Sequence, residues 1–113
     1  MSVLERAQKH YADLGRLDME VPEWGCTVFW TPFTLEDGDI LARAADHRKR
    51  PLSAADILIL KAQGTDGKPL FQKDDRDTLM KKVDRGVVVR IANKITAGGN
   101  VDDAEKNSET IAG

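Results

Sequence analysis

A pair of strand-like runs near the start of the chain constrains its fold more than any other feature. Leu17, Met19 and Val21 alternate with charged residues, which is the period of a strand with one buried face. The segment Pro22–Gly25 breaks this run, and residues 26–31 that follow are rich in β-branched and aromatic side chains. The sequence therefore predicts one β-hairpin in a chain whose other patterns are helical.

Helical periodicity and capping residues account for most of the chain before residue 65. We expect helices over residues 3–14, 34–49 and 53–64, each opened by a serine or threonine that can cap the first backbone amides. The apolar residues of the second helix should form its buried stripe: Ile40, Leu41 and Ala44.

A turn at Asp66-Gly67 leaves Phe71 as a lone large apolar residue ahead of a more helical region. Acidic residues open that region, and apolar residues then recur at every fourth position: Leu79, Val83, Val87, Ile91 and Ile95. Gly86 and the valines at 87–89 disfavour one continuous helix, so we expect two helices with a kink, with a break or a short strand near residue 86 as the alternative.

The chain is of ordinary domain size, with 113 residues of which 41% are hydrophobic. These patterns predict an α+β fold that is mostly α, in which an N-terminal helix and a β-hairpin pack on a bundle of about four helices. Residues 1–97 should form a single domain. Residues 98–113 lack apolar periodicity, so we expect them to form a flexible, disordered tail.

Charge and cysteine content limit the partners and the compartment. With 17 basic and 19 acidic residues, the chain has no overall field that would hold nucleic acid or an anionic membrane. Cys26 is the single cysteine, and the longest aliphatic run, Ile57–Leu60, is too short to span a membrane. We therefore expect a cytoplasmic protein that binds no membrane and is not built to bind nucleic acid.

The chain offers little for catalysis. His10 and His47 lie far apart in the sequence, and with one cysteine they do not make a zinc ligand set. Ser2 and Ser53 are explained as helix caps, so no nucleophile with an evident base remains. We expect no enzyme activity, no cofactor and no metal.

Five of the six aromatic residues are the best candidates for a binding surface: Trp24, Phe29, Trp30, Phe33 and Phe71. Packing of the hairpin against the helices would explain many of them, because aromatic residues bury large areas. The alternative is an exposed docking face, since tryptophan is enriched among interface anchors. If Trp30 lies on such a face, Trp30→Ser should abolish binding and leave the melting temperature nearly unchanged.

The order and spacing of these features resemble the tail assembly chaperone family of long-tailed, siphovirus-type bacteriophages. The resemblance covers residues 20–97 and rests on several short motifs: Trp24 before the strand with Val28, the helix entry Thr34–Asp37, the element Asp66–Phe71, Asp75 and Leu79, and the helix with Val83, Val87, Ile91 and Ile95.

The resemblance implies a small non-catalytic protein that binds the tape measure protein and keeps it soluble while tail tube subunits assemble. Such a protein would act in the host cytoplasm and be absent from the mature virion. It also implies a possible longer product of programmed frameshifting that recruits tail tube protein, and possible self-association. A tape measure is a long helical chain with apolar seams, so its chaperone needs an exposed apolar groove or stripe.

Three other functions remain open. The protein could be another phage structural component, such as a head-tail connector, which would stay in the virion. It could also be a small regulatory DNA-binding module, in which Arg48, Lys49 and Arg50 contact phosphates. A small enzyme is the third alternative.

Overall fold

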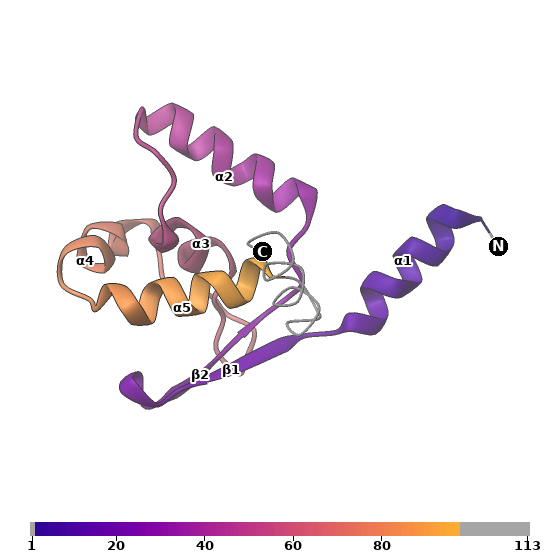
Figure 1. Ribbon diagram of the computed structural model, residues 1–113, viewed down its shortest axis with the longest axis horizontal. Coiled ribbons are helices and arrows are strands. Elements are labelled where there is room, and N and C mark those ends of the chain that lie inside the picture. The colour runs from indigo at the N-terminus through magenta and orange to yellow at the C-terminus, as the bar shows by residue number, and fades with distance from the viewer. Residues whose placement is uncertain (1, 98–113) are drawn as a thin grey trace, which may run out of the picture.

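The computed structural model describes residues 2–97, which form a mostly helical α+β fold around one two-stranded antiparallel sheet (Figure 1). The order of its elements follows the chain: α1 (Val3–Leu14), β1 (Leu17–Val21), η1 (Pro22–Trp24), β2 (Cys26–Trp30), α2 (Leu35–Arg48), α3 (Ala54–Lys61), η2 (Lys73–Asp75), α4 (Arg76–Lys81) and α5 (Arg85–Thr96). The predicted tail at 98–113 lies outside the described residues.

The hairpin forms as predicted, with Leu17 paired to Trp30 and Met19 to Val28. Gly25 closes its loop in the left-handed region, at φ +62°. Beyond the hairpin, the backbone of Phe29 exchanges hydrogen bonds of 2.9 and 2.8 Å with that of Gln63. This pairing ends α3 at Lys61, three residues before the end that the sequence predicted, because Gln63 must be extended to reach β2.

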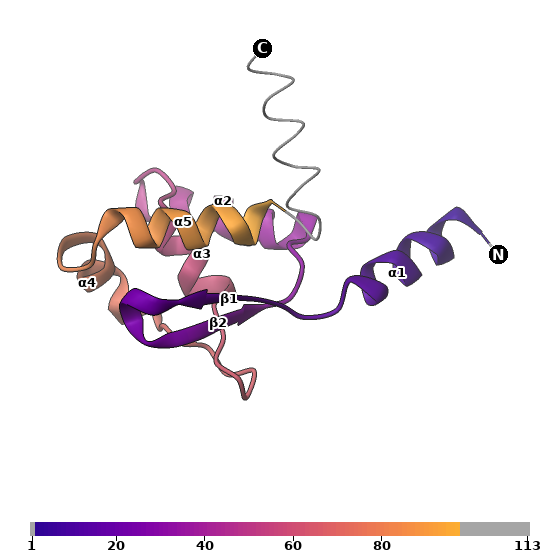
Figure 2. The same ribbon diagram turned by 60° about the horizontal axis from the view of Figure 1, so that its bottom comes forward.

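The core lies between one face of the hairpin and helices α3 and α5 (Figures 1 and 2). Its largest fully buried side chains come from all three parts: Trp30, Leu58, Ile91, Ile95, Val21 and Val28. The two predicted helices are present, but a break at residues 82–84 separates α4 from α5 in place of a kink at Gly86, which lies inside α5. Asp84 accepts a hydrogen bond from the Val87 amide and so caps α5. The valines at 87–89 are helical.

Helix α1 has the predicted bounds but does not pack on the bundle. It projects from the body (Figures 1 and 2), and none of its residues is buried. Val3 and Leu4 are 72% and 70% exposed. Its link to the body is the Tyr11 hydroxyl, which donates a 2.9 Å hydrogen bond to the Pro32 carbonyl.

Helix α2 covers the bundle from outside and buries only Leu41 (Figure 1). The prediction of a buried stripe was therefore wrong for Ile40, which is 37% exposed, and for Ala44, which is half-buried. Both residues instead face a groove.

Among residues 2–97, no helix is long and apolar enough to span a membrane.

Candidate partner-binding groove

An open groove of about 670 Å³ runs between α2 and α3 and is bordered by the segment that leads into α4. The residues that line it include seven apolar side chains: Ile40, Leu41, Ala44, Ile59, Leu60, Pro69 and Phe71. We call this site the α2/α3 groove.

The floor of the α2/α3 groove is apolar and partly open to solvent. Ile59 and Leu60 are half-buried although they belong to a helix whose Leu58 is fully buried in the core. Helix α3 is apolar on nearly every side, so its outer residues have no core of their own to enter. An exposed apolar surface of this kind is a candidate interaction site.

One end of the groove is fixed by a buried ion pair. Lys61 in the last turn of α3 donates hydrogen bonds to Asp37 in the first turn of α2, at 2.9 Å, and to Thr31, at 2.8 Å. Burial alone would raise the pKa of Asp37, but hydrogen bonds from Lys61 and the Thr34 amide outweigh it and lower that pKa. Asp37 therefore remains a carboxylate that holds both helices.

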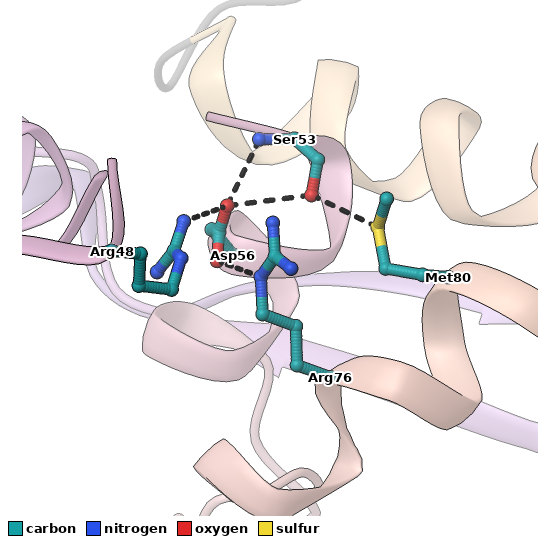
Figure 3. A network of polar contacts seen from close by, with 5 residues as sticks. All are labelled: Arg48, Ser53, Asp56, Arg76 and Met80. Carbon is teal, nitrogen blue, oxygen red and sulfur yellow. Dashed lines mark hydrogen bonds and ion pairs between the residues drawn. The ribbon is translucent and has the colours of Figure 1, made fainter. Parts of the chain in front are cut away.

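The other end is fixed by Asp56, a buried carboxylate at the start of α3 (Figure 3). Arg48 from α2 donates to its Oδ2 at 3.0 Å, and Arg76 from α4 donates to its Oδ1 at 2.9 Å. The Ser53 amide also donates to Oδ2, at 2.9 Å. Burial would raise the pKa of Asp56, but these hydrogen bonds and the two arginine charges outweigh it and lower the pKa.

The Ser53 hydroxyl lies 3.3 Å from both Asp56 Oδ2 and Met80 Sδ (Figure 3). It has one proton to donate, and the charged carboxylate is the stronger acceptor. Through Arg48 and Arg76, Asp56 connects α3 to both α2 and α4.

The groove carries excess positive charge. Its lining includes Arg43, Arg48, Lys73 and Arg76, but Asp56 is its one carboxylate, so the formal charge is four minus one, or +3, with His47 neutral. The whole chain has a net charge of −2, so this charge is local.

Of the five predicted site residues, Phe71 is the one that lines the α2/α3 groove. The Trp24 ring meets the Phe71 ring edge to face, with ring centroids 6.1 Å apart. Trp24 is held in place through its neighbour Glu23, whose carboxylate accepts two hydrogen bonds from Arg90 at 2.7 and 2.8 Å. The structure thus joins Trp24 and Phe71 in one unit beside the groove.

The other three predicted residues lie elsewhere. Trp30 is 1% exposed and belongs to the core, so the alternative of an exposed docking face is wrong for this residue. Phe29 points to the opposite side of β2, where the Arg16 guanidinium stacks 4.1 Å from its ring centroid. Phe33 is half-buried against the core.

The groove residues on α2 and α3 were missed as a site. Ile40, Leu41 and Ala44 were assigned to the core, because a helical stripe does not show whether another element covers it. A usable signal was the continuous apolar run Ile57–Leu60, which gives α3 more apolar faces than one core can cover.

Of the three cations considered for DNA contact, Arg48 is paired with Asp56, and Lys49 and Arg50 do not line the groove. Arg50 lines the adjoining hollow, together with Arg48 and Arg76. Within residues 2–97, histidine, cysteine, aspartate and glutamate side chains do not gather in any group of three that could hold a metal ion.

Comparison of the chain with protein-family models, with curated proteins and with solved structures finds no match.

Proposed function

We propose that this protein is a phage tail assembly chaperone that binds the tape measure protein through the α2/α3 groove and keeps it soluble during tail tube assembly. The observation that supports this function is an open apolar groove between two helices that are braced at both ends. The order of sequence motifs over residues 20–97 supplies the choice of partner.

A groove with helical walls suits a helical ligand. An amphipathic helix binds by laying its apolar face into such a groove, with anchors spaced at one helical turn. An extended peptide would instead need an unpaired strand edge, and here both long walls are helices. A tape measure protein presents apolar helical seams, and covering them would suppress its aggregation.

The proposal carries further consequences for location and partners. The protein would act in the host cytoplasm and leave before the virion is complete. A longer frameshifted form would recruit tail tube protein, and the exposed apolar stripe of α1 provides a surface that is separate from the groove.

Co-expression with the tape measure protein of the same phage tests the proposal. We expect the tape measure protein to become soluble and to co-elute with this chain in size-exclusion chromatography. An insoluble tape measure protein beside a free, folded chain would contradict it. If this chain is instead found in purified virions, the protein is a structural component such as a head-tail connector.

A further inference from the structure

We infer that the segment bound in the α2/α3 groove is an amphipathic helix with acidic side chains beside its apolar stripe. This inference rests on the proposed function for the identity of the natural partner. It adds the chemistry of the bound segment, which follows from the charges around the apolar floor.

The groove places its cations on two elements. Arg43 and Arg48 come from α2, while Lys73 and Arg76 come from the segment at the start of α4. A helix in the groove would therefore meet positive charge from both. Asp74 and Asp77 do not line the groove, but they line an adjoining hollow that shares Lys73 and Arg76 with it, so they reduce the positive charge on that side.

Two of these cations are available to a partner. Arg48 and Arg76 share Asp56, whereas Arg43 and Lys73 form no ion pair within residues 2–97. Both Arg43 and Lys73 are exposed. Carboxylates on a docked helix would pair with them at the rim, where exposed ion pairs add modest affinity and strong preference between partners.

The apolar floor favours an amphipathic helix over a nucleic acid as the ligand of this groove. Phosphate backbones are held by cations and polar groups, and a floor of aliphatic side chains gives them no contact. Arg43 also lies one turn from Ile40 on the same helix face, so an anchor in the floor and a charge at the rim can come from a single bound helix.

Two synthetic helical peptides of about 18 residues test the inference. They share one leucine stripe, flanked by glutamate in one peptide and by lysine in the other, and binding to the full chain is measured by fluorescence anisotropy. We expect the glutamate peptide to bind about tenfold more tightly at low salt, at about threefold for each of two exposed pairs. This preference should disappear at about 1 M salt, where the Debye length is about 3 Å.

Charge-reversal variants locate the preference. The double variant Arg43→Glu/Lys73→Glu should remove or invert the preference for the glutamate peptide over the lysine peptide. The control Lys81→Glu/Lys82→Glu makes the same change in net charge at exposed positions outside the groove, and it should keep the preference. Far-UV circular dichroism of each variant confirms that it is folded.

The inference is overturned if the two peptides bind equally, if the lysine peptide binds better, or if neither binds. Equal binding together with a solubilised tape measure protein would leave the proposed function standing and remove the acidic preference. A strong glutamate preference together with an insoluble tape measure protein would support the groove chemistry and reject the proposed partner.

Discussion

Lys61 and Asp37 form an ion pair of 2.9 Å that joins the last turn of α3 to the first turn of α2, with the lysine side chain 7% exposed. Arg48 and Asp56 join the opposite ends of the same two helices at 3.0 Å. These two pairs brace α2, which buries only one residue of its own. The width of the α2/α3 groove therefore depends on charged contacts at its ends.

Replacing Lys61 should loosen this brace. In Lys61→Met, Asp37 loses its charged partner while still partly buried, which we expect to lower the free energy of unfolding by about 2 kcal/mol. Urea denaturation followed by circular dichroism measures the change. The double variant Lys61→Met/Asp37→Asn should recover part of the loss, and a double variant as unstable as the sum of both single variants would contradict a direct pairing.

Acid should weaken the same braces. The pKa values of Asp37 and Asp56 are lowered in the folded protein from an ordinary value of 3.8, so folding favours their charged forms. Their contribution is fully present above pH 3.8 and is lost as the pH falls through the lower folded values. Melting temperatures measured from neutral pH downward should therefore decline most steeply below about pH 4.

The variant Asp56→Asn provides the matched control for this pH dependence. It should be less stable than the natural sequence at neutral pH, because Arg48 and Arg76 lose their shared carboxylate. Its acid decline should be shallower, since one titrating group is gone. An unchanged acid profile in this variant would show that Asp56 does not carry the effect.

The pKa of the Glu23 carboxyl provides a separate test of its pairing with Arg90. Its hydrogen bonds from the Arg90 side chain, helped by a backbone hydrogen bond, lower its pKa to about 2. In Arg90→Gln this pKa should rise toward the ordinary glutamate value near 4.5. Carbon-detected NMR of the side-chain carboxyl measures both values, and an identical pKa in the two proteins would contradict the pairing.

Trp30 should behave as a core residue. Trp30→Ser removes a fully buried indole, and we expect a loss of about 3–5 kcal/mol in the free energy of unfolding, close to the whole stability of a small domain. Thermal melting checks this outcome against Tyr11→Ser, which alters an exposed ring on α1 and should lower the melting temperature little. A Trp30→Ser protein that melts like the natural one would contradict the packing described above.

Local patterns were sufficient to predict the hairpin and the starts of α1, α2 and α3. The alternation at Leu17, Met19 and Val21, the cap at Thr34 and the bond from the Ser53 amide to Asp56 act within a few residues, so a sequence shows them directly. The end of α3 was misplaced because Gln63 pairs with Phe29, a contact between distant parts of the chain.

The groove could not be predicted for the same reason. Ile40 looks like a core residue in the sequence, but no other element within residues 2–97 covers it, and it is 37% exposed on the groove. Phe71 was identified as a candidate because it stands alone between two helices, whereas Trp30 was not distinguishable from an exposed anchor until the opposite face of β2 was known.

The most direct test of the groove as the binding site is a paired comparison on one helix. Ile40→Ser changes the groove wall, and Leu35→Ser changes a residue that is 93% exposed on the same helix outside the groove. Each variant is co-expressed with the tape measure protein, and the co-purified amount is measured by size-exclusion chromatography. We predict that Ile40→Ser loses most of the complex and that Leu35→Ser retains it. Equal retention by both variants, or loss with Leu35→Ser alone, would contradict binding in the groove.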